Sequence, residues 1–353
     1  MIDLKRRIEA FVKLGKFMGE FCEYSNKTAH DGYPNKPWFH KLEQKVRLAG
    51  QSNGWFTEEN VLFALKSWSK LLTEDRLLHW LSAYNLEKSK KKNVALITAG
   101  NIPLVGFHDF LAVLLTGNSV QVKLSSNDKI LLPFLAEYLR EMEPTLKNTI
   151  RFTEKKLDAF DAIIATGSDN TARYFEYYFA QKPNLIRKNR NSVAVLTGNE
   201  SPEQLKALGE DIFRYYGLGC RSVSKIFVPM DYDFDVFFTA IYSYKDIINH
   251  QKYANNYDYN KAVYLMSEFK ILDNGFLMLK EDESYASPIA SLFYERYASL
   301  KDIIVKLEQD KHKIQCVVSH GNIKNEVPFG KTQTPSLTDY ADGVDTVDFL
   351  LKT

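Results

Sequence analysis

Apolar residues recur at helical spacing through the first part of the chain. In the stretch LLTEDRLLHWLSAYNL they fall at positions i, i+3, i+4 and i+7, which places them on one face of a helix. The opening stretch MIDLKRRIEAFVKLGKFMGEF interleaves apolar and charged residues in the same way, and the Asn53–Gly54 pair is typical of a turn. The pattern predicts a helical N-terminal region over residues 1 to about 90.

A different pattern begins at residue 94, where short apolar runs alternate with amphipathic stretches. The runs VALIT, SVQVKL and AIIAT predict three strands, and a stretch of helical periodicity follows each of them. A fourth run, SVAVLTG, precedes a helix whose Ser201 and Gln204 fit an N-terminal capping box. Strands that alternate with helices are typical of a parallel sheet wrapped by crossover helices.

The change in pattern near residues 185–192 predicts a boundary between two α/β domains. Residues 1–188 are expected to form the helical N-terminal region and a nucleotide-binding domain, and residues 189–325 a second α/β domain. Residues 326–353 are expected to pack back on these domains or to contribute to oligomerisation. Within that segment, the apolar run VDTVDFLL at 344–351 predicts a strand that pairs across a subunit interface.

Composition and charge narrow the classes of partner. The 353 residues are 45% apolar, a usual share for a packed protein of about two domains. The 46 Lys and Arg residues balance 44 Asp and Glu, and the net charge of +2 excludes a global field that attracts nucleic acid or an anionic membrane. No apolar stretch reaches the length of about 20 residues of a membrane helix, and the N-terminus lacks a secretory pattern. We therefore expect a cytoplasmic protein without an integral membrane segment.

The three cysteines are far apart and odd in number, which disfavours a disulfide framework and a zinc site. Cys220 lies in GLGCRS, between flexible glycines and an arginine, a context that suits an accessible thiolate; the alternative is an inert buried side chain. Cys22 falls in an amphipathic helix and Cys316 in a strand-like run, so we interpret both as core residues. Among the histidines, we consider only His320, in a predicted turn, as a proton donor, with a turn-stabilising role as the alternative.

Small or polar residues follow three of the predicted strands, where an open α/β sheet binds ligands. Gly100–Asn101 follow the first strand, Lys123–Ser126 the second and Gly167–Ser168 the third. Each motif alone is weak, because Gly, Ser and Asn are also the usual residues of strand–helix turns. Together they favour a nucleotide site, although these turns lack the Gly-x-Gly-x-x-Gly fingerprint.

The order of these motifs resembles the aldehyde dehydrogenase superfamily. It runs from GNIPLVGFHDFLAVLLTGNSVQVKLSSND through ATGSDNTARYF and GLGCRSVSKIFVP to SPIASLFYE and PFGK, over residues 94 to about 350. Gly-Asn-x-Pro, Lys-x-Ser-Ser and Cys-x-Ser are most similar to the fatty acyl-CoA reductases of the bacterial luminescence type. The resemblance implies an aldehyde dehydrogenase-like α/β fold, with a Rossmann-type nucleotide-binding domain and a second α/β domain that carries a catalytic cysteine.

The resemblance also implies roles for individual residues. Cys220 is similar to the nucleophile of the family, and Asn101 to the side-chain amide that completes the oxyanion hole with the Cys220 backbone N–H. The resemblance implies that the adenosine ribose of the cofactor is bound by Lys123, Ser125 and Ser126. It also implies that Gly167 and Ser168 begin the helix whose N-terminus faces the cofactor pyrophosphate.

One segment departs from the pattern of the aldehyde-oxidising enzymes. About 33 residues before the nucleophile those enzymes carry a glutamate in a Glu-Leu-Gly-Gly segment, and this chain carries Arg187–Arg190 instead. The missing glutamate is the general base that activates water to hydrolyse the enzyme thioester. Its absence favours reduction of the thioester over oxidation to a free acid. We interpret the cationic run as a solvated turn, with contact to the phosphates of CoA or NADP as the alternative.

The resulting hypothesis is an NADPH-dependent reductase that converts acyl-CoA to an aldehyde through a cysteine thioester. The reaction requires no metal, and NADH is the alternative cofactor. Two other hypotheses are reduction of another activated acyl group, such as an acyl phosphate, and an aldehyde dehydrogenase-like binding protein without turnover. We expect a homo-oligomer and no nucleic-acid partner. The aromatic-rich residues 230–260 are the candidate lining for the acyl chain.

Overall fold

The computed structural model describes residues 4–25, 37–86, 90–321 and 323–353. The chain forms two compact units, of which the first combines Met1–Lys188 with Ser336–Thr353 and the second is Asn189–Pro335. The segment 326–353 is thereby divided, because residues up to Pro335 stay with the second unit and the rest returns to the first. None of the described helices has both the length and the apolar character of a bilayer-spanning helix.

The N-terminal part of the first unit is helical, which confirms the prediction from periodicity. Its helices are α1 (Leu4–Ser25), α2 (Pro37–Ser52), α3 (Glu58–Leu71) and α4 (Glu74–Leu81). Thr57 caps α3 by accepting a hydrogen bond from the Asn60 backbone N–H, so the Asn53–Gly54 turn leads into a helix start. Helix α1 packs on α6 (Leu131–Met142), where Phe17 stacks on Tyr138 with ring centroids 4.3 Å apart.

A five-stranded parallel sheet forms the centre of the first unit, in the order β3-β2-β1-β4-β5. Its strands are β1 (Asn93–Ile97), β2 (Ser119–Lys123), β3 (Ile150–Thr153), β4 (Ala162–Thr166) and β5 (Asn184–Arg187). The helices between them are α5 (Phe107–Leu115), α6, the short 3-10 helix η2 (Pro144–Asn148) and α7 (Asp169–Phe179). The apolar pattern misses β3 and β5, because each edge strand has only four residues and is partly exposed.

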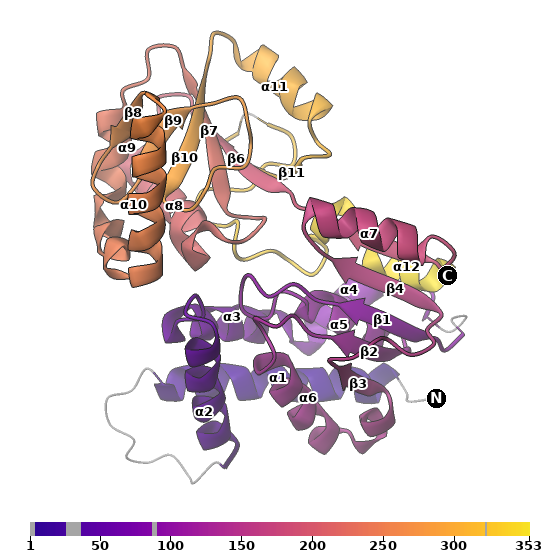
Figure 1. Ribbon diagram of the computed structural model, residues 1–353. Helices are drawn as coiled ribbons and strands as arrows, with labels where there is room; N and C mark the ends of the chain where they lie inside the picture. Colours follow the sequence, from indigo (N-terminus) through magenta and orange to yellow (C-terminus); the bar gives the residue numbers. More distant parts are fainter. Residues whose placement is uncertain (1–3, 26–36, 87–89, 322) are drawn as a thin grey trace. The chain divides into compact units, whose positions relative to one another are not determined.

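Helices cover both faces of this sheet. Phe175 and Phe179 of α7 pack on one face, against Ile163 of β4. Val94 of β1 and Val122 of β2 belong to the core that α1, α5 and α6 share on the other face. Figure 1 shows how these helices lie beside the sheet. The first unit is therefore a sheet enclosed between helical layers, as the alternating pattern predicts.

The second unit is built on a six-stranded sheet in the order β11-β6-β7-β10-β9-β8, parallel except for the pair of β8 and β9. Its strands are β6 (Asn191–Val195), β7 (Val223–Pro229), β8 (Ile271–Asp273), β9 (Met278–Glu281), β10 (Ser291–Tyr297) and β11 (Ile314–Val318). Its helices are α8 (Pro202–Phe213), α9 (Phe234–Ile241), α10 (Gln251–Met266) and α11 (Leu300–Gln309), with the 3-10 segments η3 (Arg214–Gly217) and η4 (Tyr242–Asn249).

Successive residues of β6 face opposite sides of the second sheet. Ala194 belongs to the core under α8 and α9, whereas Val193 and Val195 belong to the core under α11. The predicted capping box at the start of α8 is confirmed. The Ser201 hydroxyl accepts from the Gln204 backbone N–H at 3.3 Å, and the Gln204 side chain accepts from the Ser201 N–H at 2.8 Å.

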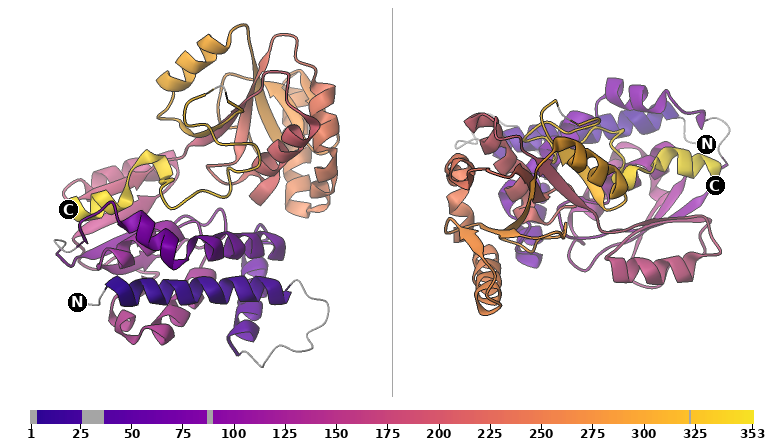
Figure 2. Two further views of the ribbon diagram at one scale, coloured as in Figure 1. Left: turned by 180° about the vertical axis from the view of Figure 1, so that it is seen from behind. Right: turned by 90° about the horizontal axis from the view of Figure 1, so that it is seen from above.

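The C-terminal apolar run forms a helix, so the prediction of a strand at 344–351 is wrong. The elements of this segment are η5 (Ala341–Gly343) and α12 (Thr346–Lys352). Asp345 accepts a hydrogen bond from the Asp348 N–H at 2.9 Å and caps the helix. Val347 and Leu350, three positions apart, are both buried in the core of the first unit. Figure 2 shows α12 in yellow beside the first sheet.

A buried ion pair joins three parts of the first unit. Arg187, the last residue of β5, binds Asp109 of α5 through Nη2 at 2.6 Å and Nε at 3.2 Å. The two side chains are only 5% and 9% exposed. Arg187 also donates to the Ala341 carbonyl at 2.6 Å and to the Thr346 hydroxyl at 2.8 Å. One guanidinium group therefore ties the C-terminal segment to β5 and α5.

Replacing Arg187 with Met should lower the free energy of unfolding by about 3–5 kcal/mol, because it leaves the Asp109 carboxylate buried without its counter-charge. Burial favours the neutral acid, but the Arg187 charge holds the pKa of Asp109 below its ordinary value. In the native protein this stabilisation is fully present above about pH 4 and is lost as the pH falls through the lowered pKa, so the loss in the variant should shrink as the solution becomes more acidic.

Urea unfolding at neutral and acidic pH measures this loss. The double variant Arg187→Met, Asp109→Leu is the matched control and should recover most of the stability, since it removes both buried charges. A single variant Arg187→Met as stable as the native protein would contradict the role of the pair.

Candidate active site

Three turns at one edge of the first sheet carry the residues that the sequence predicts for the cofactor. Strand β1 pairs in parallel with β2 and β4, with Ile97 opposite Lys123 and Leu96 opposite Ile164. The turns after these strands therefore begin side by side, at the carboxyl edge where such sheets bind ligands. The predicted residues at this edge are Asn101, Lys123, Ser125, Ser126, Gly167 and Ser168.

The first two turns touch, and a residue from the N-terminal helices joins them. A Cβ atom on Gly100 would lie 2.6 Å from Ser125 Oγ, so only glycine allows this approach. The Asn53 side-chain amide donates to the Gly100 carbonyl at 3.4 Å and to the Asn127 carbonyl at 3.3 Å. The sequence indicates Asn53 only as a turn residue, because its bonding partners lie far along the chain. Asn53 is thus a positioning residue that sequence reasoning misses.

A buried carboxylate lies close to the turn after β1. Burial raises the pKa of Asp128 to about 6, and the backbone N–H groups of Leu104 and Leu131 oppose this rise. Among the described residues, the Asp128 Oδ1 atom has no hydrogen-bond partner. Leu104 has a φ of 59°, in the left-handed region that side chains rarely adopt. The turn that precedes α5 is therefore strained, and it also contains Asn101.

The turn after β4 opens a helix. Ser168 caps α7, because its Oγ accepts from the Thr171 N–H at 3.4 Å and lies 3.0 Å from the Thr171 hydroxyl. A Cβ atom on Gly167 would lie 2.9 Å from Thr171 Cγ2, so the chain approaches the helix closely there. Backbone N–H groups at the start of a helix favour anions. The local geometry fits the pyrophosphate of a dinucleotide cofactor.

A cavity of about 240 Å³ in the second unit has Cys220 in its wall. The cysteine follows α8 and three consecutive residues with positive φ, Tyr215 at 57°, Tyr216 at 58° and Gly217 at 76°. Two of these residues are not glycine, so the turn that leads into the cysteine loop is strained. Strain of this kind persists only where surrounding structure holds it, which marks the loop as a candidate functional element.

Two side chains contact the Cys220 loop. Cys220 Sγ lies 3.8 Å from Asn189 Oδ1. The Ser192 hydroxyl donates to the Cys220 carbonyl at 2.9 Å and lies 3.0 Å from Cys316 Sγ. Because the Ser192 proton points to the carbonyl, the Cys316 thiol is the donor in the second contact. Cys22 is buried as predicted, but Cys316 is only partly buried, so its interpretation as a core residue is wrong.

The cationic run at 187–190 divides among different environments. The interpretation of Arg187 as a solvated residue is wrong, because it is buried against Asp109. Lys188 forms an ion pair with Glu176 at 2.7 Å, and Arg190 lines the Cys220 cavity. The member of the run that contacts the Cys220 sulfur is the amide of Asn189, a residue type that cannot act as a general base near neutral pH.

Apart from Cys220 itself, the described lining of this cavity offers no group that exchanges protons near neutral pH, because it contains no Asp, Glu or His. His320, in the turn after β11, is not one of these lining residues. Of the aromatic-rich segment 230–260, only Tyr253 contributes to the described lining, so the expected acyl contact narrows to that residue. Over the described parts of the chain, no three His, Cys, Asp or Glu side chains gather as metal ligands do.

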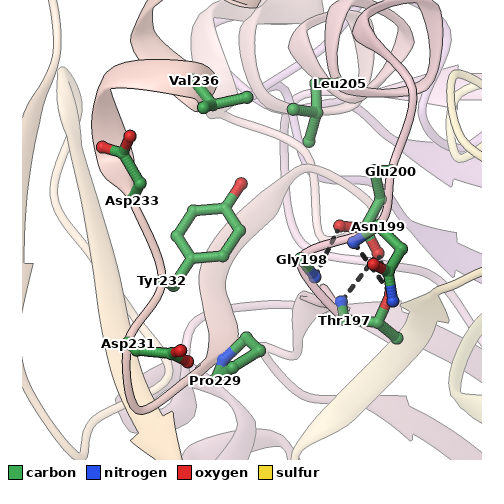
Figure 3. A pocket seen from close by; sticks show the side chains of 10 residues that line it. All are labelled: Thr197, Gly198, Asn199, Glu200, Leu205, Pro229, Asp231, Tyr232, Asp233 and Val236. Atoms are coloured by element: carbon green, nitrogen blue, oxygen red, sulfur yellow. Dashed lines mark hydrogen bonds between the residues drawn. The ribbon is translucent and has the colours of Figure 1, made fainter.

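A second cavity, of about 350 Å³, lies at the end of β7 that is farther from Cys220 (Figure 3). Cys220 precedes β7, whereas Pro229, which lines the second cavity, ends it. In Figure 3 the Tyr232 ring points its hydroxyl into this space. The Glu200 carboxylate accepts from the Thr197 N–H at 2.7 Å and so stabilises a turn. This lining includes neither Cys nor His, and we place the candidate active site at Cys220.

The two units together define an aldehyde dehydrogenase fold, which confirms the predicted fold class. Aldehyde dehydrogenase 21 from Physcomitrella patens, solved with the reaction product succinate, matches with a TM-score of 0.69 and 11% identity over 100% of this chain and 84% of that one. An aldehyde dehydrogenase from Bacillus cereus, solved with NAD⁺, matches with a TM-score of 0.62 and 12% identity over 90% of this chain and 72% of that one. An indole-3-acetaldehyde dehydrogenase solved with NAD⁺ gives a TM-score of 0.63 and 11% identity over the same shares.

The family model for acyl-CoA reductase (LuxC) matches residues 76–240, which include the three strand-end turns and Cys220. Comparison with the curated proteins gives no match. The family match over this part of the chain and the aldehyde dehydrogenase fold together support an acyl-CoA reductase of the LuxC type, and hence an NAD(P)-dependent oxidoreductase.

Iodoacetamide at pH 8 should label Cys220 much faster than Cys22 in the native protein. Burial raises the pKa of Cys22 to about 11, so only about one thiol in a thousand is ionised at that pH. Cys220 lies in the wall of a cavity instead. Peptide mapping by mass spectrometry gives the order of labelling, and labelling in denaturant is the control in which the difference should vanish. Equal rates in the native protein would contradict the burial of Cys22.

Proposed function

We propose that this chain reduces acyl-CoA to an aldehyde with NADPH, through a thioester on Cys220. The observation that carries the proposal is a cysteine in a cavity whose described lining offers amide, hydroxyl, guanidinium and apolar groups but no carboxylate or imidazole. A thioester formed there has no lining group to activate water, so it survives long enough to be reduced. The match to the acyl-CoA reductase family supports the same chemistry.

Cys220 is the proposed nucleophile, acting as a thiolate. Its sulfur bonds to the carbonyl carbon of acyl-CoA, the bond from that carbon to the CoA sulfur breaks, and CoA leaves as a thiolate. The Ser192 hydroxyl, bonded to the Cys220 carbonyl, orients the loop that presents the Cys220 N–H to the developing oxyanion. Asn101 is the proposed second donor. A donor of this kind stabilises the transition state of acyl transfer by about 3–4 kcal/mol.

The strand-end residues of the first unit are the proposed cofactor site. A bound reduced nicotinamide supplies the hydride for reduction of the thioester. Gly167 and Ser168 open the helix whose N–H groups face the pyrophosphate, and the Ser168 cap keeps that helix start in place. Ser125 and Ser126 offer hydroxyls to the ribose. Lys123 adds a positive charge beside them, which favours the extra phosphate of NADPH over NADH.

Release of the product returns Cys220 to its starting state. After reduction, the acyl carbon is bonded to both an oxygen and the Cys220 sulfur. Collapse of this hemithioacetal breaks the carbon–sulfur bond, forms the aldehyde carbonyl and leaves a thiolate on Cys220. The enzyme therefore needs no water in the cycle, which agrees with a cavity that lacks a general base in its described lining.

Cys220→Ala should lower the rate of NADPH consumption with acyl-CoA by more than about 10³-fold, because no thioester can form. Absorbance of NADPH measures the rate across a panel of acyl-CoA chains and an acyl phosphate. Cys22→Ala, in α1, is the matched cysteine control and should keep the native rate.

Each outcome separates one hypothesis from another. Reductase activity that survives in Cys220→Ala would refute the nucleophile. Activity with the acyl phosphate but not with acyl-CoA would overturn the substrate class. A native protein that consumes NADPH with neither substrate would favour the binding protein without turnover.

Asn189→Glu should turn the protein toward acyl-CoA hydrolysis, because it places a carboxylate beside the thioester sulfur. The release of free CoA thiol in the absence of any nicotinamide cofactor measures this gain, which should be about 10²-fold or more, the scale of general-base catalysis. Asn189→Gln has the same chain length without a base and should show no gain. Hydrolysis that stays at the native rate in Asn189→Glu, while Cys220 is still acylated, would show that the missing base does not limit hydrolysis.

A further inference from the structure

The lining of the Cys220 cavity divides into exposed residues and buried apolar residues, from which we infer an open mouth and an apolar floor. Its exposed lining residues mark the mouth and are Asn189, Gly217, Ala286 and Pro288. Its buried lining residues include an apolar floor formed by Ile212, Phe213, Tyr253, Leu277 and Ala290. Cys220 itself is half-buried, between these two environments. A substrate that bonds to its sulfur can therefore direct an apolar group away from water and toward the floor.

Neighbouring contacts hold the floor in place. The Tyr253 hydroxyl donates to the Phe276 carbonyl at 2.9 Å, and the side chain is only 2% exposed. The Phe213 ring lies against Tyr244 and Phe276, with centroids 5.2 and 5.8 Å apart. Leu277, next to Phe276, is 1% exposed. These side chains come from α8, α10 and the turn before β9, so several elements would have to move before the floor gave way.

We propose that Phe213, Tyr253 and Leu277 set the length of the acyl chain that Cys220 accepts, an inference that rests on the proposed function. The cavity volume of about 240 Å³ is below the 300–1,000 Å³ or so that enclose a drug-sized ligand. It therefore takes the acyl chain, while the CoA portion remains outside the mouth. Arg190, a cation in the lining that also donates to the Lys311 carbonyl, adds a positive charge that favours the phosphates of that portion.

Chain length should affect the reaction in a simple way. Each further methylene that enters the cavity raises the rate constant of Cys220 acylation about fourfold, as burial of one CH₂ group predicts. Once the end of the chain meets the floor, a longer chain gains no burial and strains the packed side chains, so the rate falls. The optimum length therefore reports the position of the floor.

Acylation of Cys220 by a series of straight-chain saturated acyl-CoA tests this inference. Intact-protein mass spectrometry follows the covalent adduct without any nicotinamide cofactor. Phe213→Leu and Leu277→Ala make the cavity deeper and should move the optimum to chains about two carbons longer. Leu277→Phe makes the cavity shallower and should move the optimum to shorter chains. A variant that is merely destabilised lowers the rates at all lengths alike, and Phe213→Leu retains a large apolar side chain in case Leu277→Ala folds poorly.

Val236→Ala is the matched control, because Val236 lines the second cavity of the same unit. It should keep the native profile of rate against chain length. If the native protein acylates and every variant keeps the native optimum, the role of the floor is refuted and the proposed function stands. If the native protein forms no adduct with any acyl-CoA, the proposed function itself fails.

Discussion

The buried pair of Arg187 and Asp109 is the constraint on which the first unit depends. Two charges taken out of water cost free energy that only close, hydrogen-bonded geometry offsets. Here one guanidinium group satisfies the Asp109 carboxylate, the Ala341 carbonyl and the Thr346 hydroxyl together. Arg187 also ends β5, next to the boundary at Lys188. The strand that completes the first sheet, the helix that covers it and the returning C-terminal segment are therefore fixed at one point.

The residues with proposed chemical roles lie in turns, and residues from elsewhere hold those turns. Asn53 bridges two turns of the first sheet, although it is 74 residues away from Asn127 in sequence. Ser192 of β6 holds the carbonyl of Cys220, 28 residues further on. Such contacts make the turns rigid while the side chains that face a substrate stay accessible. This division of labour is common where function lies on loops carried by a rigid scaffold.

Sequence patterns predict what local chemistry determines and miss what long-range contacts determine. Periodicity, strand-end turns and the Ser201 capping box are local signals, and they lead to the helical N-terminal region and the parallel α/β architecture. The aldehyde dehydrogenase fold is what the resemblance of the ordered motifs implies. The run at 344–351 alternates well enough for a strand, yet the cap at Asp345 and burial against the first unit make it a helix. The burial of Arg187 cannot be predicted, because Asp109 is 78 residues away.

The division of the first unit into two stretches of sequence has a consequence for biosynthesis. The ribosome must make the entire second unit before α12 emerges, so the first unit waits without its last helix. Until then Arg187 lacks the Ala341 and Thr346 acceptors, and the apolar core that takes Val347 and Leu350 stays uncovered. The second unit is continuous and can close as soon as its own chain is complete. The second unit can thus finish folding before the first unit, although most of the first unit is translated earlier.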